Sequence, residues 1–143
     1  MFSGRESALY DKEHIDLALY RMEKAEETLT DAKDALRMGK FANAANRSYY
    51  AFFHAVRALF ALEAKDFRKH SGVIAGFQKD YIKTGVFPVE MGKQLQSAFN
   101  LRTQSDYRDF YVLTKEKVAA QVANAETFVE TLKARLLSMI AQE

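Results

Sequence analysis

The sequence predicts an all-α fold, an up-and-down bundle of four to five helices, and three observations support this prediction. The 143 residues include only one proline and six glycines, which leaves few places for turns. Apolar residues recur three and four positions apart over long stretches, the spacing that places side chains on one face of a helix. Hydrophobic residues make up 48% of the chain and charged residues 28%, the balance of an ordinary globular domain. We therefore expect residues 1–143 to form one domain, with a helical core from about residue 12 to residue 140.

The first helix is expected from Asp11 to Met38. Gly39 follows it, and glycine commonly ends a helix because it tolerates the left-handed conformation. The apolar face of this helix consists of Ile15, Ala18, Met22, Ala25, Leu29, Ala32 and Leu36. Its outer face carries acidic residues, for which solvation is the expected role: Glu23, Glu26, Glu27, Asp31 and Asp34.

The second helix is expected from about Phe41 to Lys65, and apolar residues cover most of its circumference. They are Ala44, Ala45, Tyr49, Tyr50, Ala51, Phe52, Phe53, Ala55, Val56, Leu59, Phe60 and Leu62. A helix that is apolar nearly all round belongs in the centre of a bundle.

A polar break follows the second helix. Ser71 is then the expected N-cap of a third helix, because a serine hydroxyl can accept a hydrogen bond from a free backbone N–H group in the first turn. This helix is expected to end near Thr84, before Gly85. Pro88 suits the first turn of a fourth helix, where the missing N–H group carries no cost.

The helical period is lost from Thr103 to Leu113, and this segment is expected to be a longer connection. Thr114 then caps a final helix that reaches about Ile140. The inner face of the final helix consists of Val118, Val122, Ala125, Val129, Leu132, Leu136 and Met139.

Composition excludes several classes of function. The chain has no cysteine, which rules out disulfides, thiolate metal sites and a cysteine nucleophile. No apolar run approaches the ~20 residues of a membrane span, and residues 1–11 lack the apolar core of a signal peptide. No metal-ligand cluster or phosphate-binding glycine pattern is present. We therefore expect a cytoplasmic protein without a membrane segment and without a cofactor.

Charge is distributed unevenly along the chain. Residues 40–108 contain eleven lysines and arginines against five acidic residues, whereas the whole chain has a net charge of only +2. A basic middle favours a phosphate-bearing ligand or an acidic protein surface, although solvated lysines are the more common explanation of such an excess.

A polar stripe interrupts the apolar second helix. At about 100° per residue, its members fall within roughly 80° of one another around the axis. They are Asn43, Arg47, Tyr50, His54 and Arg57. Arg47 and His54 are two turns apart, ~10 Å along the axis. Two interpretations are open: the stripe presents a permanent cation and a titratable imidazole to one anionic ligand, or these side chains hydrogen-bond neighbouring helices at the edge of a buried helix.

Residues at the start of the third helix could complete such a site. Arg68, Lys69, His70 and Ser71 lie where free backbone N–H groups and the helix dipole attract anions. Capping alone also explains Ser71.

Residues on the fourth helix form a further candidate group. Arg102 and Asp106 are four residues apart and can pair across one turn, with Tyr107 alongside, either as a structural ion pair or as part of the site. His14 lies on an acidic, exposed helix and is expected to be inert.

Four separated segments, taken in order, resemble the HEPN family, the helical domains named for higher eukaryotes and prokaryotes nucleotide binding. The segments are residues 45–55 (ANRSYYAFFHA), residues 69–73 (KHSGV), Arg102 with Asp106 and Tyr107, and residues 125–129 (AETFV). The resemblance extends from about residue 15 to residue 140. It implies a bundle of about five helices that commonly forms a homodimer. It also implies a partner, because such domains are often encoded beside a minimal nucleotidyltransferase with which they form a toxin and antitoxin pair.

The resemblance further implies a catalytic motif. In many members an arginine, a following polar residue and a histidine four to six residues later form the site of a metal-independent ribonuclease, and Arg47, Ser48 and His54 match this pattern. Arg47 and His54 are then the catalytic residues. The residues expected to bind RNA or nucleotide are Asn43, Ser48, Tyr50, Arg57, Lys69, His70, Ser71, Arg102, Asp106 and Tyr107. Val56 stands where the better-characterised toxin branch has a tyrosine, so modification of that tyrosine is not carried over.

Three functions remain open at this point. The chain is a ribonuclease toxin, a non-catalytic module that binds a nucleotide or a nucleotidyltransferase, or a homodimer whose core is the aromatic second helix. The expected partners are accordingly RNA or a nucleotide, a minimal nucleotidyltransferase and a second copy of the chain.

Overall fold

The computed structural model describes residues 10–107 and 113–142, with the backbone alone at residues 105–107. Every regular element in this part of the chain is helical, which confirms the all-α prediction. The elements are α2 (Lys12–Arg37), α3 (Phe41–Leu62), α4 (His70–Phe77), the π-helical segment η1 (Gln78–Ile82), α5 (Val89–Tyr107) and α6 (Lys115–Ala141).

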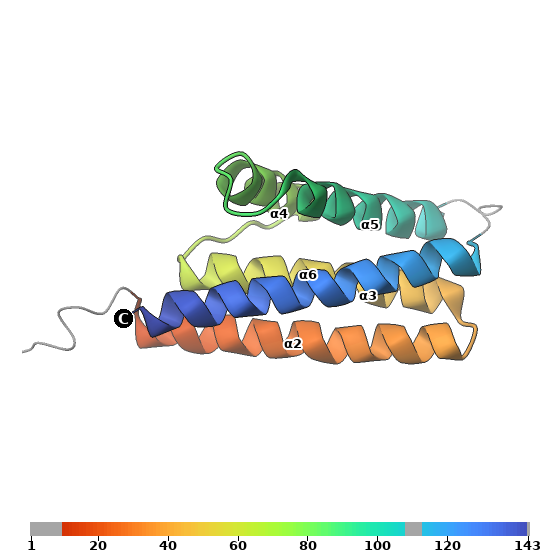
Figure 1. The fold of residues 1–143 in the computed structure, drawn as a ribbon, viewed down its shortest axis with the longest axis horizontal. Helices are drawn as coiled ribbons and strands as arrows, with labels where there is room; N and C mark the ends of the chain where they lie inside the picture. The colour runs from red at the N-terminus through yellow and green to blue at the C-terminus, as the bar shows by residue number, and fades with distance from the viewer. Residues whose placement is uncertain (1–9, 108–112, 143) are drawn as a thin grey trace, which may run out of the picture.

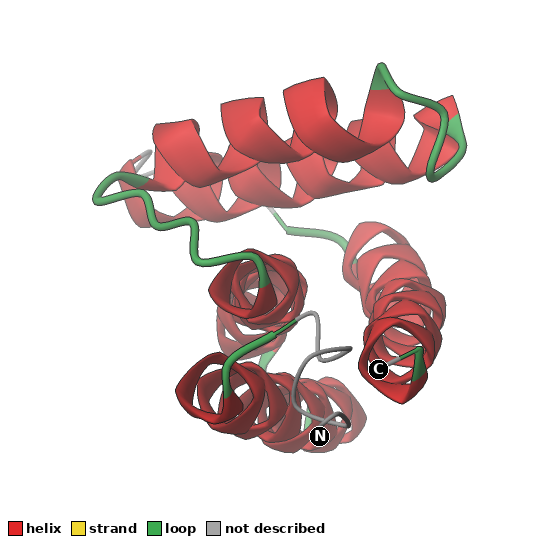
Figure 2. Cartoon of the chain, turned by 90° about the vertical axis from the view of Figure 1, so that its left-hand side faces the viewer, coloured by secondary structure: helices red, strands yellow, loops and turns green. Residues whose placement is uncertain are grey.

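The helices form two layers. The long helices α2, α3 and α6 lie side by side, and α5 lies on the other side of α3 (Figure 1). Viewed from the end, the three long helices are seen nearly along their axes, and the α4–η1 helix crosses above them (Figure 2). Only α3 contacts all four of the other α-helices in the described part of the chain. It is therefore the central helix, as its all-round apolar surface predicts.

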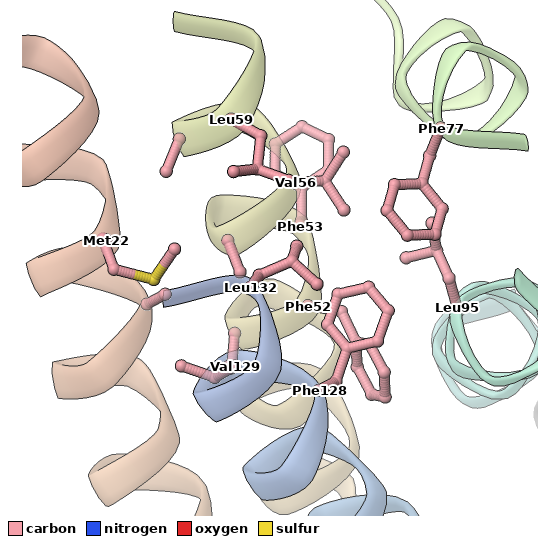
Figure 3. Close-up of a cluster of buried hydrophobic side chains, with 14 of the residues drawn as sticks. Met22, Phe52, Phe53, Val56, Leu59, Phe77, Leu95, Phe128, Val129 and Leu132 are labelled. Atoms are coloured by element: carbon pink, nitrogen blue, oxygen red, sulfur yellow. The ribbon is translucent and has the colours of Figure 1, made fainter. Parts of the chain in front are cut away.

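The core forms around α3 (Figure 3). The fully buried Phe52 contacts Phe128 of α6, with ring centroids 4.6 Å apart, and Phe77 of α4 contacts Phe128 from the other layer at 5.5 Å. Met22 of α2 and Leu95 of α5 close the cluster from opposite sides. Burying a large aromatic or aliphatic side chain contributes about 1.5–3 kcal/mol, so this cluster holds the layers together.

The end of α3 differs from the prediction by a few residues. The helix ends at Leu62 and not at Lys65, because Ala64 adopts a left-handed conformation with φ of 59°. The N–H group of Lys65 then donates to the carbonyl of Phe60, which satisfies a backbone acceptor of the last turn. The ammonium group of Lys65 lies 2.9 Å from the carboxylate of Asp80, which ties this turn to η1.

The prediction that Ser71 caps the third helix is wrong. The helix begins at His70, and the residue before it, Lys69, has the extended backbone of an N-cap without a side-chain cap bond. Ser71 therefore lies inside the first turn of the helix, where it is not the N-cap residue. The α4–η1 helix ends at Ile82, and Gly85 turns the chain with φ of 81°.

Gly76 shows why α4 packs so closely. A Cβ atom at this position would lie 2.8 Å from the ring of Phe67 and 3.2 Å from that of Phe60. Only glycine leaves room for these rings, so Gly76 allows α4 to approach the end of α3.

The last two helices confirm one prediction and correct another. Thr114 caps α6 as predicted, because its hydroxyl accepts a hydrogen bond from the N–H group of Lys117 at 3.2 Å. The expected connection from Thr103 is wrong in its first part, since α5 continues to Tyr107. Leu101 packs against the cluster of Val118 and Val122, and backbone hydrogen bonding carries the helix beyond that last apolar contact. Residues 108–112 of the expected connection lie outside the described residues.

Candidate functional site

The polar stripe lies on the side of α3 that the apolar core leaves partly open. Arg47 is half-buried, and its guanidinium group donates to the side-chain oxygen of Asn46 from Nη2 at 2.6 Å and from Nε at 3.0 Å. The same guanidinium lies over the ring of Tyr50, 5.2 Å from its centroid. The ring of Tyr50 also lies 5.9 Å from the imidazole of His54. Tyr50 therefore connects the two predicted catalytic residues.

His54 is a half-buried imidazole surrounded by cations. Burial lowers the pKa of His54 to about 4, and the positive charges of Arg57, Lys24, Arg47 and Arg21 act in the same direction. Among the described residues, none hydrogen-bonds the imidazole. At neutral pH His54 is therefore uncharged and can accept a proton, and a bound anion would reverse the electrostatic part of the shift.

Arg57 extends the cationic surface by one turn of α3. Its guanidinium lies over the ring of Phe53, 5.7 Å from the centroid, and Nη2 is 3.2 Å from a carboxylate oxygen of Asp66. Arg21 of α2 donates to the main-chain carbonyl of Arg57 at 3.3 Å. Burial lowers the pKa of Arg21, and the nearby charge of Arg57 contributes. Two arginines from different helices thus lie together beside His54.

The structure brings the beginning of α4 to the stripe through His70. Its Nδ1 atom lies 2.7 Å from the hydroxyl oxygen of Tyr49. Its ring stacks on Phe53, with centroids 4.3 Å apart and planes inclined by 18°, and contacts Tyr50 edge-on at 5.7 Å. Burial lowers the pKa of His70, and the charges of Arg102 and Arg57 add to this effect.

The neighbours of His70 on α4 are less enclosed. Lys69 and Ser71 are both exposed on either side of it. They are available to an extended ligand, but neither is held in place by a side-chain hydrogen bond within the described residues.

Arg102 reaches the same cluster from α5. Its guanidinium carbon lies 5.6 Å from the ring centroid of Tyr49 and 5.5 Å from that of Tyr50. The predicted pairing of Arg102 with Asp106, and the position of Tyr107, concern side chains outside the described residues. The three segments that were singled out separately in the sequence therefore meet at the rings of Tyr49 and Tyr50.

Ser48 does not belong to this surface. It is fully buried, its hydroxyl donates to the carbonyl of Ala44 at 2.7 Å, and it accepts a hydrogen bond from Nε2 of Gln121 on α6, also at 2.7 Å. The same Nε2 donates to the carbonyl of Ala45. Ser48 thus joins α3 to α6, and its expected contact with a ligand is withdrawn because no ligand can reach it in this packing.

Asn43 lies at the other end of the stripe. It is exposed and lines a groove of about 440 Å³ between the end of α2 and the beginning of α3. Asn46 and Arg47 also line this groove, so it opens directly beside the predicted catalytic arginine.

Several residues of the site were not anticipated from the sequence. Arg21 and Lys24 belong to a helix whose outer face was assigned to solvent, and Tyr49 and Phe53 were counted only as core. The spacing of Arg21 and Lys24 places them on one side of their helix, but only the packing of α2 against α3 shows that this side meets His54.

The described residues were also searched for a metal site and for a membrane-spanning helix. They contain no group of three or more histidine, aspartate or glutamate side chains that could hold a metal ion. None of the described helices combines the length and apolarity that a membrane span needs.

Comparison with known proteins identifies the family to which this arrangement belongs. Residues 18–135 match the HEPN domain, and this range includes α3, α4 and α5 with every residue of the site described above. The chain belongs to the HEPN family. Its fold and the order of its sequence motifs agree with this assignment.

Relatives of this HEPN protein occur in bacteria and archaea. A UPF0332 protein of Thermotoga maritima is 36% identical over 114 residues, which cover 80% of this chain and 86% of that protein. Two proteins of Methanocaldococcus jannaschii are each named "Putative toxin". One is 31% identical over 82% of this chain and 80% of its own length, and the other is 30% identical over 93% of this chain and 98% of its own length. The similarity to toxin-named proteins thus extends over nearly the whole domain.

Proposed function

We propose that this HEPN protein is a toxin-type ribonuclease that cleaves RNA without a metal ion, with Arg47 and His54 as catalytic residues. The observation that carries the proposal is the setting of His54. It is an uncharged, partly accessible imidazole surrounded by four cationic side chains, one of which, Arg47, contacts the same Tyr50 ring as His54. Arginine and lysine side chains bind phosphate groups, so RNA is expected to bind here. An uncharged imidazole beside the bound phosphate can accept a proton from the reacting hydroxyl group.

The chemistry requires no group beyond the substrate and the protein. His54 accepts the proton of a ribose 2′-hydroxyl, and the 2′-oxygen attacks the adjacent phosphorus. The bond from phosphorus to the 5′-oxygen breaks, which leaves a 2′,3′-cyclic phosphate and, after the 5′-oxygen gains a proton, a 5′-hydroxyl. Arg47 neutralises the charge that develops on the phosphoryl oxygens, an effect that is typically worth about 10²–10³-fold in rate.

The surrounding side chains suit a single-stranded nucleic acid. The guanidinium groups of Arg47 and Arg102 both lie over the Tyr50 ring, 5.2 Å and 5.5 Å from its centroid, and Arg57 lies two turns further along α3. Proteins that bind single strands combine cations that contact the backbone with aromatic rings on which bases stack, each stack contributing about 1–3 kcal/mol. Asn43 at one end of the stripe, and Lys69 and Ser71 on either side of His70, extend the proposed contact.

A nucleotidyltransferase and a second copy of the chain are the proposed protein partners. The toxin names of two relatives favour a toxin and antitoxin arrangement, and a homodimer would bring two Arg47 and His54 pairs to one cleft. Co-purification with the product of a neighbouring nucleotidyltransferase gene, and the molar mass in solution by light scattering, test the two parts separately. A chain that stays monomeric at assay concentration contradicts the shared cleft.

The decisive experiment is RNA cleavage in the presence of EDTA. We expect the wild-type protein to cleave an end-labelled single-stranded RNA, and His54→Ala to lower the rate by about 10²–10⁴-fold because the proton acceptor is lost. Arg47→Gln removes the charge and is expected to lower the rate by about 10²-fold or more. His14→Ala is the matched histidine control and Arg135→Gln the arginine control, since neither residue belongs to the site described above, and we expect their replacement to leave cleavage unchanged. Equal cleavage by wild type and His54→Ala contradicts the proposal.

A non-catalytic nucleotide-binding or partner-binding module is the second candidate. The observation in its favour is the hydrogen bond between Arg47 and Asn46, which already holds the guanidinium in place. This function predicts saturable nucleotide or partner binding that weakens with salt and with Arg47→Gln, but no RNA turnover. Isothermal titration with nucleotide or with the purified nucleotidyltransferase distinguishes it from the ribonuclease.

A further inference from the structure

We propose that His70 is a second catalytic imidazole, the general acid that protonates the departing 5′-oxygen, and that Tyr49 positions it. This inference rests on the proposed ribonuclease function and assigns the one proton that His54 and Arg47 do not supply. The sequence places His70 in a different helix from His54, and only the packing of α4 against α3 brings the two together.

The two imidazoles flank one pair of aromatic rings. His54 lies 5.9 Å from the ring of Tyr50 and 6.0 Å from that of Phe53, and His70 lies 5.7 Å and 4.3 Å from the same two rings. Arg57 lies over Phe53 and influences the pKa of both histidines. A phosphodiester held by this arginine would thus lie beside two imidazoles, and separate proton removal and proton delivery require two such groups.

Tyr49 holds the second imidazole in one orientation. Its side chain is fully buried, and its hydroxyl lies 2.7 Å from Nδ1 of His70. Burial raises the pKa of Tyr49, so the hydroxyl keeps its proton. It can donate to Nδ1 of the neutral imidazole and accept from the Nδ1–H group of the charged one. In the charged imidazole Nε2–H is therefore the proton available to a ligand, and the neutral imidazole left after its transfer keeps Nδ1–H hydrogen-bonded to the Tyr49 oxygen.

The charges around His70 favour protonation only when an anion is present. Arg57 of α3 and Arg102 of α5 both face the ring, Tyr49 and Tyr50 are the other titratable groups in contact with it, and Lys69 precedes it in α4. A bound phosphodiester offsets the two arginines and thereby raises the affinity of His70 for a proton. The acid would thus be charged when the substrate is in place.

The protons of the reaction then balance. His54 removes the proton from the 2′-hydroxyl while His70 gives its Nε2 proton to the 5′-oxygen as the bond from phosphorus breaks. After turnover His54 carries a proton and His70 lacks one, and exchange with water restores both. Replacing His70 should therefore slow the breaking of the bond from phosphorus to the 5′-oxygen, but it should not impair the attack of the 2′-oxygen.

A sulfur-substituted RNA tests this division of roles. The probe is an oligoribonucleotide with a single cleavable linkage, prepared with either oxygen or sulfur at the bridging 5′ position, because a thiolate leaves without needing a proton. We expect His70→Gln to cleave the oxygen substrate about 10²–10³-fold more slowly than wild type. It should cleave the sulfur substrate within about threefold of the wild-type rate on the same substrate, since general-acid help is no longer required. His54→Ala should remain slow on both substrates.

Tyr49→Phe tests positioning. The ring and its packing remain, and only the hydrogen bond to His70 is lost, so we expect about a tenfold loss on the oxygen substrate that the sulfur substrate restores. In the NMR spectrum of the free protein, the titration and the tautomer of His70 should change while those of His54 stay as in wild type. A variant that loses activity equally on both substrates contradicts a positioning role.

The outcomes separate this inference from the ribonuclease assignment. If wild type cleaves and His54→Ala does not, but His70→Gln is equally slow on oxygen and sulfur substrates, His70 only binds or stabilises and the inference is wrong. Full activity of His70→Gln on the oxygen substrate also overturns it. Absence of cleavage by wild type overturns both proposals. Thermal unfolding shows whether each variant is folded. If His70→Gln does not fold, His70→Asn replaces it, because asparagine is smaller and its side-chain oxygen can still accept a hydrogen bond from Tyr49.

Discussion

The two sides of α3 are built from the same kinds of residue but have opposite roles. The side toward α2 and α6 buries Phe52, Val56 and Leu59 among other apolar side chains, and its one polar group, Ser48, is completely hydrogen-bonded. The other side also carries aromatic rings, but these rings contact guanidinium and imidazole groups, as at Tyr50. Rings on the first side contribute stability through burial, whereas rings on the second side hold charged groups in place.

Charge is balanced differently on the two sides. Between α2 and α6, Lys33 pairs with Glu126 at 2.5 Å and Lys133 pairs with Glu26 at 2.9 Å. Around His54, four cations lower the pKa of the imidazole, and Asp66 is the carboxylate that pairs with Arg57. The excess of positive charge on that side weakens the affinity of His54 for a proton and prepares the surface for an anion. Four predictions test this difference between the two sides of α3.

The largest effect on stability is expected on the apolar side. Phe52→Ala leaves a cavity against Phe128, so the free energy of unfolding should fall by about 3–5 kcal/mol. His54→Ala, about half a turn away on the same helix, should change it by about 1 kcal/mol or less. Urea denaturation followed by circular dichroism measures both. Similar losses for the two variants would show that the sides do not differ as described.

A pH effect comes next and belongs to the charged side. The folded protein keeps His54 unprotonated down to its pKa of about 4, whereas the unfolded chain takes up this proton near pH 6.5. The lowered pKa therefore contributes stability that is complete above pH 6.5 and is lost as the pH falls toward 4, up to about 3 kcal/mol. His70 acts in the same direction. Chemical denaturation at several pH values should show a shallower dependence of the free energy of unfolding on pH for His54→Gln than for wild type.

A smaller effect separates the structural polar residue from the proposed catalytic ones. Ser48→Ala removes one of the two acceptors of Gln121 Nε2 and should lower the free energy of unfolding by about 1–2 kcal/mol. RNA cleavage, measured well below the unfolding temperature, should keep its wild-type rate. A selective loss of cleavage in a folded Ser48→Ala protein would return this residue to the site.

The smallest effect is expected for an exposed ion pair of the stabilising side. Lys33→Gln removes the pair with Glu126 and should cost less than about 1 kcal/mol, because solvent screens charges at the surface. Arg57→Gln should instead raise the pKa of His54 toward 6.5, because it removes a positive charge beside the imidazole. An NMR titration of the imidazole measures this change. An unchanged His54 titration in Arg57→Gln would contradict the electrostatic account of the site.

Much of this molecule follows from local patterns in the sequence. The three-and-four spacing predicts α2 and α6 to within one or two residues, and the threonine before α6 is the cap that its position suggests. The apolar circumference of residues 41–62 identifies α3 as the central helix. Predictions that depend on a single residue were weaker. Ser71 does not begin α4, and α5 extends past Thr103, because backbone geometry and backbone hydrogen bonding determine where these helices begin and end.

The candidate site shows the same division. Periodicity alone places Arg47, Tyr50, His54 and Arg57 on one side of a helix, and the ordered motifs predict the HEPN family that the comparisons confirm. The tertiary structure decides what lies beside that side. It adds Arg21 and Lys24 from α2, brings His70 onto the hydroxyl of Tyr49, and buries Ser48 against α6. The physical reason is that the period of a helix determines which of its own residues share a face, whereas the groups that contact this face come from segments distant in sequence. Their charges and hydrogen bonds act only once the helices have packed.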